Sequence, residues 1–139
     1  MGPRIMTLPS KQLRITVVDD EVLIASTLAT VLCNQGFDAS FFTNSLQALQ
    51  AARHYAPDLL IAEVSMPSLS GIELAIQMQK HCPNCKVLLF SDWPDTADMF
   101  TASRADGHNF DVLPKPTHPV EILTKIQSTL GLASLPKCA

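Results

Sequence analysis

The sequence has no long hydrophobic run. No segment approaches the roughly 20 consecutive apolar residues that a membrane-spanning helix needs, and residues 1–14 contain no apolar stretch of signal-peptide length. The chain also lacks a basic stripe, and its formal net charge of −3 argues against a general binder of nucleic acid or of acidic membranes. We therefore expect a cytoplasmic protein that contacts neither nucleic acid nor a membrane.

A disulfide framework is absent as well. The four cysteines are Cys33, Cys82, Cys85 and Cys138. They are widely scattered, and a chain of 139 residues is large enough to fold without such cross-links. Reduced thiols are therefore expected.

One pair of cysteines stands in the segment HCPNCK, residues 81–86, with the spacing of half a zinc site. A structural zinc ion needs four ligands, and only His81 lies close by in the sequence. A redox CxxC motif is expected at the N-terminus of a helix, whereas this one precedes a predicted strand. We favour a turn at Pro83 and Asn84, with metal binding by Cys82 and Cys85 as the alternative.

The chain has the length of one domain, and its apolar pattern alternates five times between strand and helix. The predicted strands are 13–18, 37–42, 58–63, 86–91 and 110–115, followed by helices at 22–35, 46–55, 72–81, 96–105 and 120–131. Strands buried on both faces lose their polar alternation, so the pattern predicts a parallel sheet with helices on both faces. This is a three-layer, doubly wound α/β sandwich at 12–131, with a flexible leader at 1–11 and a tail at 132–139.

Chemically active side chains gather at the predicted carboxyl ends of the strands. They are Asp19, Asp20, Glu63, Ser91 and Lys115. Such ends share one edge of a doubly wound sheet, where three carboxylates need a counter-charge from Mg²⁺ or from the ammonium of Lys115. Ser91 and Lys115 would then be donors toward a phosphoryl group. The alternative is that Asp19, Asp20 and Lys115 form no phosphoryl or metal site and serve only as helix caps and as a salt bridge.

The segments VVDDE, PDLLIAEVSMPSLSG, LLFS and LPKP, in this order and at these separations, resemble the receiver domain of two-component response regulators. The resemblance covers about residues 12–131. It implies a flavodoxin-like, five-stranded parallel sheet in the order 2-1-3-4-5. It also implies that Pro67 and Gly71 belong to the loop that follows the phosphorylation site.

The same resemblance assigns roles to the residues at the strand ends. Asp19 and Asp20 match the acidic pair that holds Mg²⁺, with the backbone carbonyl of Ser65 as a further ligand. Ser91 matches the hydroxyl residue that turns toward the phosphoryl group, and Lys115 matches the lysine that pairs with it.

Glu63 occupies the position of the phospho-accepting aspartate. Its carboxylate reaches farther by one methylene, roughly 1.3 Å, and in-line phosphoryl transfer demands tighter placement than that. Conventional phosphorylation is therefore not favoured, and the expected magnesium affinity is weak or absent. Three interpretations stay open: an inert pair between Glu63 and Lys115, imitation of the phosphorylated state, and phosphorylation of Glu63 itself.

Two further positions depart from the receiver pattern. Asp92, followed by Trp93, stands where a small residue usually leaves the phosphoryl site open. Val112 stands at the position of the aromatic switch residue, with Phe110 two residues earlier. Trp93 also belongs to an apolar cluster around the fourth helix, which is either part of the core or a partner surface.

We therefore expect a stand-alone atypical receiver that acts as a phosphorelay or protein-interaction module and is not an enzyme. The implied partner is a histidine kinase or a downstream effector, bound through the face of the fourth helix, fifth strand and fifth helix, with a homodimer as a further possibility. The alternative is a small Mg-dependent phosphatase or phosphotransferase that uses an aspartate after the first strand. The chain offers little room for the specificity element of such an enzyme.

Overall fold

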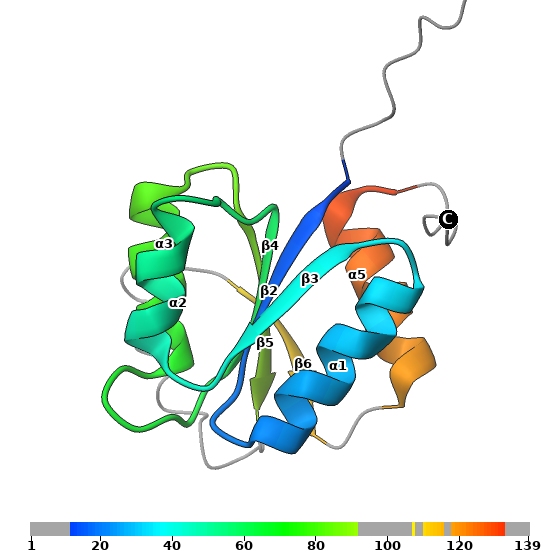
Figure 1. Ribbon diagram of the computed structural model, residues 1–139, viewed down its shortest axis with the longest axis horizontal. Helices are drawn as coiled ribbons and strands as arrows, with labels where there is room; N and C mark the ends of the chain where they lie inside the picture. Colours follow the sequence, from blue (N-terminus) through cyan, green and yellow to red (C-terminus); the bar gives the residue numbers. More distant parts are fainter. Residues whose placement is uncertain (1–11, 92–106, 108–109, 116–117, 133–139) are drawn as a thin grey trace, which may run out of the picture.

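A parallel sheet forms the centre of the molecule. The computed structural model describes residues 12–91, 107, 110–115 and 118–132, and its strands are β2 (Arg14–Val18), β3 (Asp38–Phe42), β4 (Leu59–Glu63), β5 (Lys86–Ser91) and β6 (Asp111–Pro114). The strands lie in the order β3-β2-β4-β5-β6, and every neighbouring pair is parallel (Figure 1). Counted along the chain, this is the predicted order 2-1-3-4-5, which is confirmed.

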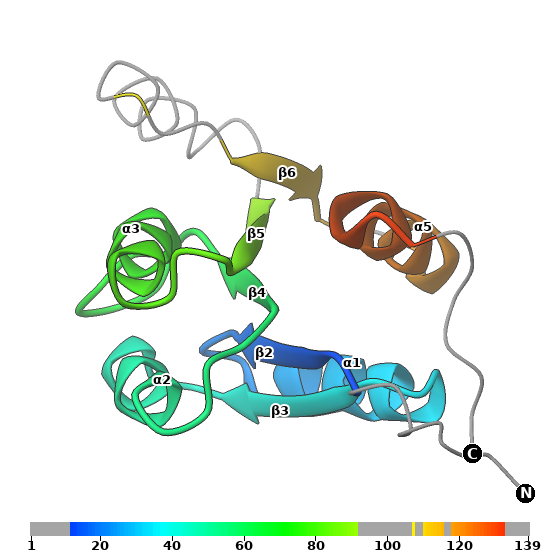
Figure 2. The ribbon, with the colours of Figure 1, turned by 90° about the horizontal axis from the view of Figure 1, so that it is seen from above.

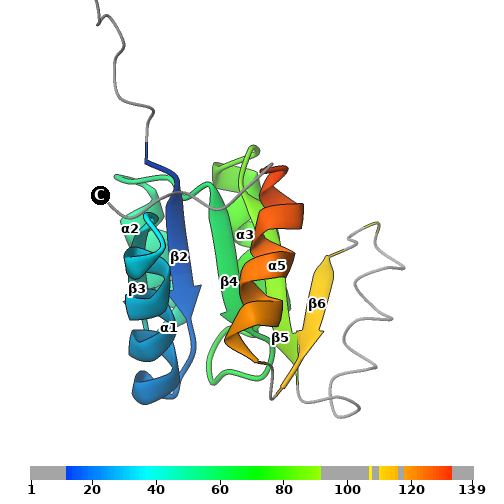
Figure 3. The same cartoon turned by 90° about the vertical axis from the view of Figure 1, so that its right-hand side faces the viewer.

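Helices cover both faces of this sheet. They are α1 (Val22–Asn34), α2 (Ser45–Ala52), α3 (Gly71–His81) and α5 (Pro119–Leu130). Figure 2 shows α2 and α3 on one side of the sheet and α1 and α5 on the other. The side view in Figure 3 shows α1 and α5 running alongside the strands. The three-layer arrangement predicted from the sequence is therefore present.

Two apolar clusters form the core, one between each pair of helices and the sheet. The buried strand β4 serves both, because successive side chains of a strand point to opposite faces. Leu60 and Ala62 join the cluster under α2 and α3, whereas Leu59 and Ile61 join the cluster under α1 and α5. This explains why β4 reads as a continuous apolar run.

Local sequence signals define where the helices begin. Asn44 caps α2, because its side chain accepts hydrogen bonds from the backbone N–H groups of Leu46 and Gln47. Pro119 occupies the first turn of α5, where its missing N–H costs no helical hydrogen bond, and His118 is the N-cap. None of the helices among the described residues is both long enough and apolar enough to cross a membrane.

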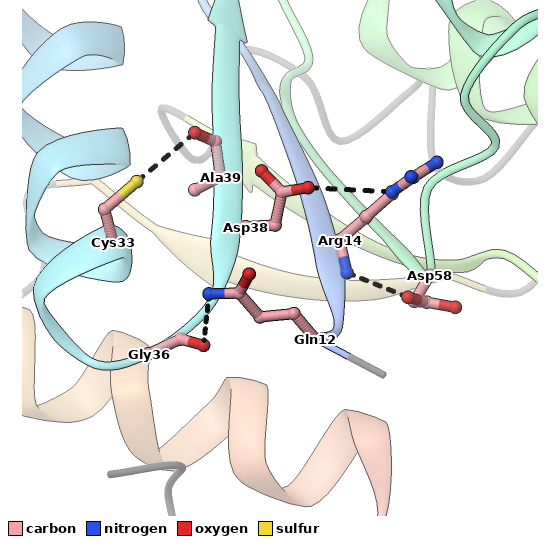
Figure 4. A network of polar contacts seen from close by, with 7 residues as sticks. All are labelled: Gln12, Arg14, Cys33, Gly36, Asp38, Ala39 and Asp58. Carbon is pink, nitrogen blue, oxygen red and sulfur yellow. Dashed lines mark hydrogen bonds and ion pairs between the residues drawn. The ribbon is translucent and has the colours of Figure 1, made fainter. Parts of the chain in front are cut away.

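A polar network fixes the starts of β2 and β3 at the edge opposite the carboxyl ends of the strands (Figure 4). The backbone N–H of Arg14 donates to Asp58 Oδ2 at 2.8 Å, and Arg14 Nε lies 3.6 Å from Asp38 Oδ2. The amide of Gln12 donates to the carbonyl of Gly36 at 3.2 Å. These contacts hold β2 in line with β3 and with the turn before β4.

Several predicted features lie outside the described residues. They are the leader at 1–11, the fourth helix at 96–105, the positions Asp92 and Trp93, and most of the tail at 132–139.

Candidate functional site

The register of the sheet brings the two predicted carboxylates side by side. Strands β2 and β4 pair in parallel with Val18 opposite Ala62, so the next residues, Asp19 and Glu63, occupy neighbouring positions at the carboxyl edge. Both residues are buried. The apolar strand segments that precede them hold them there.

Lys115 links these two carboxylates. It follows the last residue of β6, and its Nζ lies 2.9 Å from Asp19 Oδ2 and 2.7 Å from Glu63 Oε2. The side chains of Asp19 and Glu63 are each 4% exposed, and that of Lys115 is 16% exposed. The three residues thus form a largely buried triad that joins strands β2 and β4 to the end of β6.

This triad explains how a charge can end a buried strand. An isolated buried carboxylate is costly, and an ammonium group within hydrogen-bonding distance offsets much of that cost. Burial alone lowers the pKa of Lys115, but its hydrogen bonds to Glu63 and Asp19 and their negative charges outweigh burial and raise the pKa above its ordinary value. Lys115 therefore stays protonated at neutral pH.

The remaining contacts of the triad restrict its geometry. Asp19 Oδ1 accepts the backbone N–H of Glu21 at 2.9 Å, so both carboxylate oxygens of Asp19 are engaged. The backbone N–H of Lys115 donates to the carbonyl of Ser91 at 3.0 Å, which aligns the start of the loop after β6 with the end of β5. Ser91 itself is fully buried at this edge.

Asp20 and Ser65 occupy the solvent side of the site. Both are exposed, in contrast to Asp19 and Glu63. An exposed carboxylate and a backbone carbonyl are oxygen groups of the kind that Mg²⁺ takes in proteins, so the donor chemistry fits this ion. Asp19, by contrast, already binds Lys115 and the backbone N–H of Glu21, so a cation would share its carboxylate with these two groups.

Gly71 packs directly against the backbone of Glu63, a contact that the sequence motif did not indicate. Its N–H donates to the carbonyl of Val64 at 2.9 Å, and a Cβ atom at position 71 would collide with the carbonyl oxygen of Glu63. The start of α3 therefore packs directly onto the end of β4. Only glycine allows so close an approach.

Val112 lies on β6 opposite Leu89 of β5. It is half-buried and packs, together with Phe110, against the core cluster under α2 and α3. The position that matches the aromatic switch thus holds a small packing residue.

An apolar groove between α1 and α5, which Lys115 helps to line, was not predicted from the sequence. It has a volume of about 370 Å³ and includes Leu23, Ile24, Leu28, Ile122 and Leu123 among its lining residues. Leu23 is 76% exposed, although an apolar residue of an amphipathic helix is expected on the buried face. The buried stripe of α1 is instead Ala25, Ala29 and Leu32, and its small residues were the available signal.

The CxxC segment forms the turn predicted from its sequence. Cys82 and Cys85 are buried on either side of a tight turn into β5, and His81 is exposed. Within the described ranges, no group of three or more His, Cys, Asp or Glu side chains is arranged to hold a metal ion.

The fold and the triad place two buried carboxylates and one lysine at the carboxyl edge of a parallel, doubly wound sheet. The family described as "Response regulator receiver domain" matches residues 15–127, and the chain belongs to this family. Receiver domains are the signalling modules of two-component systems, and in general they bind Mg²⁺ and interact with histidine kinases or effectors.

The sequence is similar to a chemotaxis protein of comparable length and to regulators of about twice its length. Chemotaxis protein CheY of Thermotoga maritima is 28% identical over 115 residues, covering 81% of this chain and 96% of that protein. Transcriptional regulatory protein CreB of Escherichia coli is 31% identical over 114 residues, covering 82% of this chain and 49% of that protein. DNA-binding response regulator MtrA of Mycobacterium tuberculosis is 28% identical over 117 residues, 84% of this chain. The chain spans about half the length of MtrA and CreB.

Solved receiver structures share the fold. The signal receiver domain of an HD domain-containing protein from Pseudomonas fluorescens Pf-5 superposes with a TM-score of 0.79 at 23% identity, covering 87% of this chain and 96% of that one. A CheY-like receiver domain protein from Methanospirillum hungatei gives a TM-score of 0.77 at 21% identity, covering 87% and 95%. At these identities the likeness establishes the architecture alone.

Proposed function

We propose that this receiver transmits signals through protein contacts that no longer depend on conventional aspartyl phosphorylation. The carrying observation is the 2.7 Å separation of Glu63 Oε2 and Lys115 Nζ in a largely buried site. The position that would accept a phosphoryl group is filled by a longer carboxylate, and the lysine that would pair with the phosphoryl group is already bound to that carboxylate.

The extra methylene supports the proposal by its length. Phosphoryl transfer requires the attacking oxygen, the phosphorus and the leaving oxygen to lie in line, and a displacement of about 1 Å can reduce the rate by orders of magnitude. Glu63 also has little freedom to retreat, because Gly71 packs against its carbonyl and Lys115 holds its carboxylate. An acyl phosphate at Glu63 is therefore disfavoured.

The proposal includes magnesium binding, with a low affinity. Asp19, Asp20 and the carbonyl of Ser65 are the groups that would hold the ion, which when bound would neutralise charge at a phosphoryl oxygen. Asp19 is hydrogen-bonded to Lys115 and to the backbone of Glu21, so a cation competes with two existing contacts. We expect these contacts to lower the affinity.

The module is assigned to residues 12–131, with 1–11 as a leader and 132–139 as a tail. Its proposed location is the cytoplasm, and its proposed partner is a histidine kinase or a downstream effector. The proposed contact face includes β6 and α5 together with the fourth helix, which lies outside the described residues. No specific observation favours the phosphatase alternative.

Acetyl phosphate provides the decisive experiment. With Mg²⁺ present, the unmodified protein should give no phosphoprotein on intact mass analysis, whereas Glu63→Asp should restore the shorter carboxylate and gain one phosphoryl group. If Glu63→Asp also stays unmodified, the double variant Glu63→Asp/Asp92→Ala tests whether Asp92 blocks the donor. Robust phosphorylation of Glu63 in the unmodified protein would overturn the proposal.

A second variant separates the two interpretations of Glu63. If Glu63 imitates the phosphorylated state, Glu63→Gln removes the charge that holds Lys115 and should shift partner binding or self-association. If the pair is inert, the same change should alter only the free energy of unfolding.

A further inference from the structure

The turn between α3 and β5 contains the thiols of Cys82 and Cys85, which take no part in the proposed function. Cys82 is the C-cap residue of helix α3, and its backbone N–H donates to the carbonyl of Met78 at 2.7 Å. The backbone N–H of Cys85 donates to the carbonyl of Cys82 at 3.0 Å. Lys86 then begins β5. The two cysteines are therefore the first and last residues of one hydrogen-bonded β-turn.

This turn geometry suits a disulfide. An i to i+3 hydrogen-bonded turn holds its terminal Cα atoms within about 7 Å, and disulfides span Cα separations of about 4.4–6.8 Å. Both cysteines also belong to the same apolar cluster, under α2 and α3. Their side chains thus enter one region of the core from the two ends of the turn.

We propose that Cys82 and Cys85 are a redox modification site that closes to an intramolecular disulfide across the α3–β5 turn. The oxidant is a low-molecular-weight disulfide. The Cys82 thiolate attacks one of its sulfur atoms and releases the first small thiol, and Cys85 then loses its proton and attacks Cys82 Sγ, which releases the second. Two protein thiols become one disulfide, and the oxidant is reduced to two thiols.

The order of attack follows from burial. Cys82 is 8% exposed and Cys85 is 2% exposed, so Cys82 is the more accessible residue of the two and is assigned the first attack. Burial raises the pKa of Cys82. Burial, together with the neighbouring Cys82 and the negative charge of Asp58, raises the pKa of Cys85 to about 12. Because the thiolate is the nucleophile, the reaction is slow at neutral pH, and its rate should rise by about tenfold per pH unit.

The cross-link would join two elements that reach the receiver site at their other ends. Helix α3 begins at Gly71 against the Glu63 carbonyl, and β5 ends at Ser91 beside the backbone of Lys115. Oxidation would therefore restrain both elements from the opposite edge of the sheet. The proposal itself is independent of how Glu63 works.

The test uses the full chain carrying Cys33→Ser and Cys138→Ser, so that only Cys82 and Cys85 remain. The folded protein is incubated with oxidised glutathione at two pH values, quenched with acid, unfolded and alkylated. The expected product has lost two hydrogen atoms, accepts no alkyl group, and regains both thiols on reduction. Adding Cys85→Ser, or Cys85→Ala if the serine variant does not fold, gives a matched control that cannot close the disulfide and carries at most one glutathione.

Three results would overturn the proposal. They are two alkylatable thiols after incubation, a reaction that stops at one glutathione on Cys82 while Cys85 remains free, and a disulfide-linked dimer. The first would show that the oxidant does not react with Cys82 in the folded protein, and the other two would show that the turn does not bring the two sulfur atoms together.

Discussion

Gly71 lies so close to the carbonyl oxygen of Glu63 that no other residue type fits at its position. The contact joins the first residue of α3 to the last residue of β4. The backbone that carries the central carboxylate of the site is thus placed by a residue with no side chain.

Gly71→Ala should therefore destabilise the fold. The added Cβ meets backbone atoms, which cannot rotate away, so we expect a loss of about 2–3 kcal/mol in the free energy of unfolding. Urea denaturation measures the loss. Gly131→Ala is the matched control, because position 131 has open space and a positive φ of 69°, and alanine there should cost only about 1 kcal/mol. Equal losses in the two variants would contradict the close contact.

Lys115→Met should cost more, because it leaves two buried carboxylates without their counter-charge. Breaking a buried ion pair from one side typically costs about 3–5 kcal/mol. Adding Glu63→Gln to Lys115→Met removes one of the stranded charges and should recover part of that loss. The four proteins of this double-mutant cycle are compared by urea denaturation at pH 7. Strict additivity would rule out the coupling of Lys115 and Glu63.

The pH dependence of stability should also report on Lys115. Its pKa in the folded protein is raised above 10.5, so the contribution of its ion pairs is fully present below pH 10.5 and is lost as the pH rises through the folded pKa. The difference in unfolding free energy between the unmodified protein and Lys115→Met should shrink across that range. A difference that stays constant up to pH 12 would exclude a titrating Lys115.

Magnesium should bind weakly, with a dissociation constant on the order of millimolar or above, because Asp19 is already engaged. The fluorescence of Trp93, the single tryptophan of the chain, provides a readout. Asp20→Asn removes the exposed carboxylate and should abolish the response. An identical titration curve for both proteins would remove Asp20 from the site.

The sheet could be predicted from the sequence because strands that are buried on both faces are continuous apolar runs. Residues such as Leu60 and Ile61 pack on opposite faces, and only a parallel sheet with two helical layers explains such a continuous apolar run. The approach of Asp19, Glu63 and Lys115 was predictable as well, since the carboxyl ends of parallel strands share an edge.

Other features could not be predicted, because they depend on distances between elements. The contact of Gly71 with Glu63 requires the exact packing of α3 on β4 to be known. Leu23 fits a helical period as well as Leu28 does, yet the small residues Ala25 and Ala29 form the face of α1 that packs on the sheet. Whether Glu63 imitates a phosphoryl group is a question of partner binding that no residue pattern answers.

The ionic triad also sets an order in which this domain can be completed. Lys115 and Asp19 are 96 positions apart in the chain, so their contact closes one of the longest loops in the fold. Strands β2 and β4 both precede β6 in the chain, so their two carboxylates receive the positive charge of Lys115 only after β6 has been made. Docking of β6 then both extends the sheet and brings one positive charge to the two carboxylates, so the site is complete only when this long-range contact has formed.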